Sequence, residues 1–147
     1  MPEKEFRLEQ IFPVHIRDQI RMEEIWGALE EIRVRIGQPL EFITGTGSSY
    51  LTLSDGTGTW VRATEEGAAK KAYRITVRDV AELVNYSSSY SLYAYKEELK
   101  QGYLTLAGGH RVGMAGVAVT EGGQICGIRP VTVLNIRVAH EKKGGAE

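Results

Sequence analysis

Two Gly-Gly pairs within one short stretch constrain the fold of this 147-residue chain more than any other feature. They lie at residues 108–109 and 122–123, in the run LTLAGGHRVGMAGVAVTEGGQICGIRP from Leu104 to Pro130. A two-residue type I′ turn needs a positive φ at both central positions, and glycine adopts that conformation at little cost. Apolar residues recur with a period of two on either side of each pair, which is typical of half-buried strands. The pattern predicts antiparallel strands joined by two-residue hairpins.

A simple register follows if both turns contain two residues. The cross-strand pairs it predicts are Leu106 with Arg111, Val119 with Cys126, and Gly116 with Arg129. Alternation then places His110 and Arg129 on one face of the sheet and Arg111 on the other, unless Gly113 or Gly116 carries a bulge. His110 is expected only to flank its turn, with no chemistry assigned to it.

The remaining sequence predicts an α+β fold: an antiparallel β-meander in the C-terminal half packed with helices, and a β-rich N-terminal part. Thr76 and Asp79 have the spacing of a capping box at the start of an amphipathic helix, and Gly102 follows a second helix as its C-terminal cap. Residues 64–71 are expected to be solvated and mobile. A helical pattern is predicted over residues 5–31, and strands over 32–36, 40–44, 50–53, 59–63, 103–107, 110–121, 124–130 and 133–139.

Composition excludes several classes of protein. The net charge of −1 gives no global attraction to nucleic acid or to an acidic membrane surface. One cysteine, Cys126, cannot form an internal disulfide framework and fits a reducing compartment. The longest apolar runs fall far short of the roughly 20 residues that span a bilayer. We therefore expect a single cytoplasmic domain.

The sequence also lacks the common catalytic motifs. The dipeptide Gly-Lys never occurs, so there is no P-loop, and neither H-E-x-x-H nor G-x-S-x-G is present. The three histidines are far apart in the sequence, and a lone cysteine cannot build a thiolate zinc site. We therefore expect no catalytic residues and no metal site in this chain.

Arg111, Arg129 and Arg137 are the sharpest candidates for a binding site. Each lies in a predicted strand otherwise made of small or apolar residues, where a guanidinium needs a carboxylate, a neighbour at the sheet edge or a phosphate. A structural role and a ligand role both remain open for them. A tyrosine stripe at near-helical spacing could likewise stack on bases or simply pack, and it comprises Tyr86, Tyr90 and Tyr93.

Two runs carry a resemblance to a known family. EIRVRIGQPL and VAELVNYSSSYSLYAYKEELKQGYLTLAGGHRVG, with the sequence that follows to NIRVAHE, resemble the N-terminal domain of the stage III sporulation protein AA family. The resemblance extends from about Glu30 onward. It implies the ATPase component of a secretion-like complex in endospore-forming bacteria, in which a RecA-like domain follows the NIRVAHE strand. Residues 1–147 are then expected to be a single N-terminal domain of a secretion-type ATPase without its ATPase domain.

The same resemblance implies a function for the arginines. The family is similar to the type II and type IV secretion and pilus-retraction ATPases, which form hexamers and bring N-terminal arginines to nucleotide phosphates. By sheet position, the candidates are Arg111, Arg129 and Arg137. The expected function is regulation and oligomerisation of such an ATPase, and the alternatives are a single-stranded nucleic-acid binding module or a docking adaptor to a membrane complex.

Cofactors, partners and location follow from the resemblance as well. This chain is expected to hold no cofactor, whereas the longer parent protein would use ATP and Mg²⁺. The expected partners are the chain's own ATPase domain, further copies in a hexamer and the proteins of a membrane secretion complex, with no nucleic acid. The expected location is the cytoplasm of the mother cell, at the periphery of a membrane complex.

Overall fold

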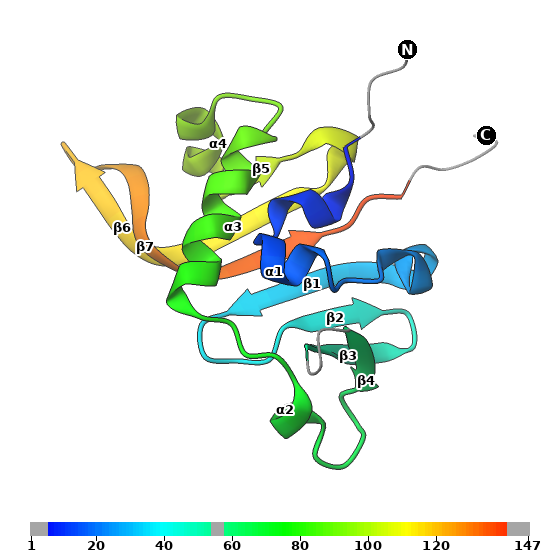
Figure 1. Ribbon diagram of the computed structural model, residues 1–147. Helices are drawn as coiled ribbons and strands as arrows, with labels where there is room; N and C mark the ends of the chain where they lie inside the picture. Colours follow the sequence, from blue (N-terminus) through cyan, green and yellow to red (C-terminus); the bar gives the residue numbers. More distant parts are fainter. Residues whose placement is uncertain (1–5, 54–57, 141–147) are drawn as a thin grey trace.

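Seven antiparallel strands form one sheet across the part of the chain that the computed structural model describes, residues 6–53 and 58–140 (Figure 1). The strand order is β4-β3-β2-β1-β7-β6-β5. The strands are β1 (Leu29–Arg35), β2 (Glu41–Thr44), β3 (Gly47–Thr52), β4 (Thr59–Arg62), β5 (Tyr103–Thr105), β6 (Arg111–Glu121) and β7 (Gln124–Arg137). Two meanders, β1 to β4 and β5 to β7, meet where β7 pairs with β1.

Helical segments precede β1, connect the first meander to the second, and form the turn between β5 and β6. The α-helices are α1 (Val14–Arg17), α2 (Ala68–Lys71), α3 (Val77–Ser89) and α4 (Tyr95–Gln101). The 3-10 turns are η1 (Leu8–Ile11), η2 (Met22–Glu24), η3 (Trp26–Ala28) and η5 (Ala107–Gly109). The predicted α+β class, with a C-terminal meander and a β-rich N-terminal part, is confirmed.

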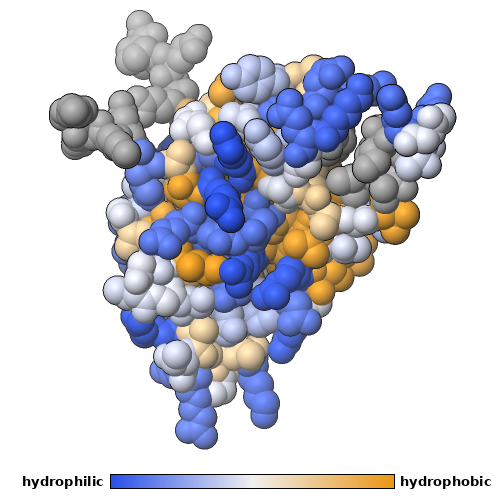
Figure 2. Space-filling view, turned by 180° about the vertical axis from the view of Figure 1, so that it is seen from behind, coloured by the Kyte–Doolittle hydropathy of each residue, from blue (hydrophilic) through white to orange (hydrophobic). Residues whose placement is uncertain are grey.

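The core lies between one face of the sheet and the helices, with α1 and α3 in front of the sheet in Figure 1. The central strands and α3 contribute fully buried side chains, among them Ile32, Val34, Leu134, Ile136 and Leu83. Because side chains alternate along a strand, the residues between these point to the opposite face. Figure 2 views the molecule from behind and shows hydrophilic side chains gathered across the middle of that open face.

The capping box of α3 forms as predicted. The Thr76 hydroxyl accepts a hydrogen bond from the Asp79 amide at 3.1 Å, and the Asp79 carboxylate accepts one from the Thr76 amide at 3.0 Å. The end of α4 is also as predicted, since Gly102 follows it with a φ of +92°. These features depend on neighbouring residues alone, which is why the sequence is sufficient to predict them.

The N-terminal segment differs from its predicted helical pattern. Residues 6–28 contain only the 3-10 turns η1, η2 and η3 and the four-residue helix α1, and β1 begins at Leu29, inside the predicted helical region. Leu8, Ile11 and Ile16 are almost completely buried, so the periodic apolar side chains anchor successive turns to the core rather than one face of a long helix. Residues 64–71 differ too: they include α2, whose Ala68 is buried.

The hairpin registers also differ from the simple prediction. The turn at Gly122-Gly123 contains two residues with positive φ, and Glu121 pairs with Gln124 as expected. The turn at Gly108-Gly109 has positive φ at both glycines but contains three residues, because the Leu106 amide donates to the His110 carbonyl at 2.8 Å. The predicted pairs are therefore wrong, and the observed ones are Thr105 with Arg111, Val119 with Gly127, and Gly116 with Val131.

The two strands predicted over 124–130 and 133–139 are a single strand, β7. Along this strand, Val131 pairs with Gly116 of β6, and the next pair is Ile128 with Ala118. Arg129 and Pro130 thus oppose the single residue Val117 in a bulge, where a proline without an amide proton interrupts no regular ladder. Proline signals a strand end in sequence, but a bulge lets the strand continue through it.

Candidate phosphate-binding site

The open face of the sheet brings two of the three candidate arginines together. Arg111 on β6 and Arg137 on β7 are direct cross-strand partners, and Arg137 in turn lies opposite Glu31 of β1. Residues paired in this way have Cβ atoms about 4.5–5.5 Å apart on the same face. Both arginines are exposed to solvent. The structure therefore pairs Arg111 with Arg137, a neighbour that the simple register did not predict.

Arg129 does not join this pair. It lies eight residues before Arg137 on the same strand, a separation of roughly 26 Å at about 3.3 Å per residue. Its side chain lies outside what the structure describes, as does that of Cys126. The role predicted for Arg129 from its sheet position stays a prediction.

The electrostatics of the arginine pair are unusual for the open face. Arg33 and Arg35 each contact a carboxylate at 3.1 Å, supplied by Glu31 and by a glutamate of β2. No ion pair between Arg111 or Arg137 and any described residue is present. Like charges directly opposite each other disfavour the folded sheet, so an anion between the two guanidinium groups would relieve a local cost.

A hollow of about 310 Å³ lies over the pair. It is lined by Gly102, Tyr103, Arg111, Gly113, Asn135 and Arg137. The Arg111 guanidinium stacks over the Tyr103 ring at 4.9 Å from its centre, which orients the cation without neutralising it. The absence of a side chain at Gly113 keeps the hollow open between the two arginines and Tyr103. Nothing in the sequence marks Tyr103 or Asn135 as site residues, because only the register places them beside the arginines.

Glu98 of α4 fixes the position of β5 beside this hollow. Its carboxylate is 4% exposed and accepts hydrogen bonds from the Thr105 amide at 2.7 Å and from the Ser91 hydroxyl. These contacts hold β5 in place, and β5 carries both Tyr103 and Thr105, the cross-strand partner of Arg111. Glu98 is thus a positioning residue that sequence reasoning missed.

His110 ties the ends of the two arginine-bearing strands together. It immediately precedes Arg111, is 6% exposed, and its Nδ1 accepts a hydrogen bond from the Ala139 amide at 3.0 Å. Burial lowers the pKa of His110, and the nearby His140 lowers it further. The neutral ring therefore acts as an acceptor that joins the start of β6 to the end of β7, and no catalytic role follows from this geometry.

A second polar cluster lies on the helical side of the molecule. The buried Asp79 carboxylate contacts His15 Nε2 at 3.0 Å and accepts from the Tyr73 hydroxyl at 2.5 Å. Burial and the hydrogen bond to Asp79 raise the pKa of the Tyr73 hydroxyl above its ordinary value. Because Asp79 also caps α3, the cluster is accounted for as a structural connection between the N-terminal segment and that helix.

The tyrosine stripe is mostly packing. Tyr86 lies beneath the Arg17 guanidinium at 5.2 Å, and the Tyr90 ring contacts that of Phe6 with centres 4.7 Å apart. Tyr93 is the exposed member of the three. A stripe with two partly buried rings is a poor platform for stacked bases.

The fold and the site together define an α+β domain that exposes a pair of arginines without carboxylate partners among the described residues. The chain belongs to the family described as sporulation stage III, protein AA, whose model matches residues 2–147. Over 125 residues it is 39% identical to the stage III sporulation protein AA of Bacillus subtilis (strain 168), an alignment that covers 85% of this chain and 34% of that relative. The chain therefore spans about a third of the length of this curated relative.

No solved structure matches the chain. Among the helices that the structure describes, none has the length and apolar character needed to cross a membrane. The resemblance noted from the sequence is thus confirmed at the level of the family, which is a sporulation family.

Proposed function

We propose that this domain regulates and helps to assemble a sporulation ATPase, and that Arg111 and Arg137 contact nucleotide phosphates held by a RecA-like domain. Membership of the sporulation family supports the biological setting. The ATPase partner and the hexameric assembly come from the resemblance to secretion ATPases. The single observation that carries the phosphate contact is the cross-strand arginine pair without carboxylate partners among the described residues.

The chemistry of the pair suits a phosphoryl group. Guanidinium groups stay charged at all working pH values and bind phosphate oxygens through two parallel N–H bonds. In phosphoryl transfer, negative charge is stabilised on the oxygens of the transferred group, and an arginine supplied from a neighbouring domain raises the rate by about 10³–10⁵ in well-studied cases. Arg111 and Arg137 lie on an exposed face, where another domain can present a nucleotide to them.

The test is ATP hydrolysis by the longer protein that the proposal assumes, in which this chain precedes an ATPase domain. Arg111→Ala and Arg137→Ala should each lower kcat by more than about tenfold, as loss of a transition-state contact does. Arg33→Ala is the matched control: it removes the same charge from the same face, but from an arginine that already contacts Glu31. We expect that variant to stay within about twofold of the parent.

Two further measurements complete this test. The 147-residue chain alone should hydrolyse no ATP, since it has no P-loop. Gel filtration of each variant separates a loss of assembly from a loss of the phosphate contact. Unchanged turnover in both the Arg111 and the Arg137 variants would reject the proposed contact.

A further inference from the structure

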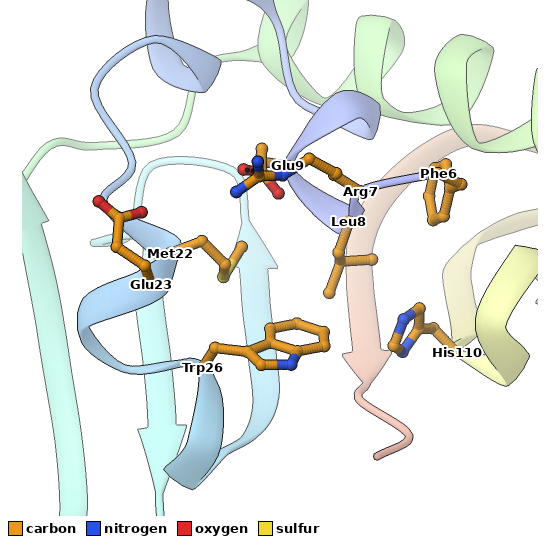
Figure 3. A pocket seen from close by; sticks show the side chains of 8 residues that line it. All are labelled: Phe6, Arg7, Leu8, Glu9, Met22, Glu23, Trp26 and His110. Carbon is orange, nitrogen blue, oxygen red and sulfur yellow. Dashed lines mark ion pairs between the residues drawn. The ribbon is translucent and has the colours of Figure 1, made fainter. Parts of the chain in front are cut away.

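A second hollow lies beside the N-terminal turns that pack on the sheet (Figure 3). It encloses about 280 Å³ between η1, the η2–η3 segment and the turn before β6. Its lining includes Leu8, Met22, Glu23, Trp26 and His110. Leu8 and Met22 are buried and form an apolar floor, and the Trp26 ring forms one wall.

His110 presents an unpartnered donor to this hollow. Because its Nδ1 accepts the Ala139 amide proton, the neutral ring carries its own proton on Nε2. That Nε2–H makes no hydrogen bond to any residue of the described ranges. The imidazole is 6% exposed and faces the hollow in Figure 3. The Nε2 atom is open to the hollow rather than sealed in the core, so a carbonyl oxygen of a ligand can accept its proton there.

The rim of the hollow carries a negative charge. Arg7 contacts Glu9 at 3.3 Å, so these two charges offset each other. Glu23 is exposed and forms no ion pair within the part of the chain that the structure describes. A basic group beside the hollow would therefore meet the Glu23 carboxylate.

The size of the hollow selects the kind of ligand. Sites for drug-sized ligands and cofactors typically enclose about 300–1,000 Å³, and this hollow lies just below that range. One large apolar side chain fits it, and such an anchor is the usual centre of a protein interface. Because it shares no lining residue with the arginine hollow, both could be occupied at once.

We propose that this hollow docks a segment of a partner polypeptide that inserts one large apolar side chain, places a basic residue beside Glu23 and offers a main-chain carbonyl to His110. The site goes beyond the proposed phosphate contact and does not depend on it. It gives the domain a docking surface that shares no lining residue with the arginine hollow.

The test uses the ¹⁵N-labelled chain and N-acetyl-Phe-Lys-amide as the probe, followed by NMR. We expect saturable shifts of the Trp26 indole and Ala139 amide signals, with a Kd of about 1–5 mM for a single anchor. N-acetyl-Gly-Lys-amide, which lacks the apolar side chain, should cause no saturable shift. N-acetyl-Phe-Glu-amide should bind several-fold more weakly because of Glu23.

A matched pair of variants tests the charge. Glu23→Lys should weaken binding of N-acetyl-Phe-Lys-amide by about fivefold. Glu24→Lys is its control, because Glu24 is also exposed but does not line the hollow. Absence of saturable shifts up to about 20 mM, equal shifts with the glycine probe, or equal loss in the two variants would each overturn the proposal.

Discussion

Two pairs of arginines on the same open sheet face behave differently. Arg33 and Arg35 on β1 each contact a carboxylate at 3.1 Å. Arg111 on β6 and Arg137 on β7 face each other with no ion pair to any described residue. The residue type, the face and the sheet are the same, so the difference comes from which carboxylate each guanidinium reaches. Arg33 contacts Glu31 on its own strand, and Glu31, although it lies opposite Arg137, forms no ion pair with it. An arginine in a strand is therefore not informative until its neighbours along and across the strands are known.

The largest expected effect on stability comes from breaking a satisfied pair. Glu41→Ala should lower the free energy of unfolding by about 1–2 kcal/mol, because Glu41 is largely buried and its loss leaves Arg35 without a partner. The Nε of Arg35 already has no hydrogen-bond partner among the described residues, so losing Glu41 would leave the guanidinium still less satisfied. Arg111→Ala should change the same quantity by less than about 0.5 kcal/mol.

Urea unfolding followed by circular dichroism measures both variants. If Arg111→Ala proves as costly as Glu41→Ala, Arg111 has a structural role and the contrast between the two arginine pairs fails.

Binding of an anion to Arg111 and Arg137 should have a smaller effect on the free energy of unfolding. Tripolyphosphate at ten times its Kd should raise the free energy of unfolding by about 1.4 kcal/mol, because the anion binds only the folded sheet. This gain in the free energy of unfolding should vanish in Arg111→Ala and Arg137→Ala. It should persist in Arg33→Ala, which has the same net charge as the other two variants. Thermal unfolding at fixed ionic strength measures it. An equal gain in all four proteins would indicate diffuse screening of charge instead of a site.

The smallest effect should be a local response to pH at the arginine end of the sheet. The pKa of His110 is lowered in the folded chain, so below about pH 6.5 the unfolded chain takes up a proton that the folded chain resists. The contribution of His110 to stability is therefore full at neutral pH and declines as the pH falls. A protonated Nδ1 cannot accept the Ala139 amide proton, which loosens the strand ends beside Arg111 and Arg137.

Hydrogen exchange at pH 7.5 and 5.5, corrected for intrinsic rates, measures this response. Protection of the Ala139 amide should fall more than protection of the Arg33 amide, and His110→Asn should remove the difference. Equal loss of protection at the Ala139 and Arg33 amides would show that His110 has no local role.

Local features of the fold were predictable from neighbouring residues. The capping box of Thr76 and Asp79, the glycine after α4 and the Gly122-Gly123 turn each depend on a few consecutive residues whose preferred geometry is intrinsic. The candidate site was predictable only in part. Two of its arginines were identified, whereas Tyr103, Asn135 and the positioning residue Glu98 come from other segments and carry no signal of their own.

The sequence by itself determined the class of fold, the position of most strands and the family, because periodicity, turn chemistry and an ordered motif are local properties of the chain. Only the tertiary structure decided which arginines meet. One extra residue in the Gly108-Gly109 turn and the bulges along β7 changed the register. Because side chains alternate with a period of two, a shift of one residue changes which groups face each other. The shifts between β6 and β7 placed Arg111 beside Arg137, and the longer Gly108-Gly109 turn placed Tyr103 opposite Gly113 next to them.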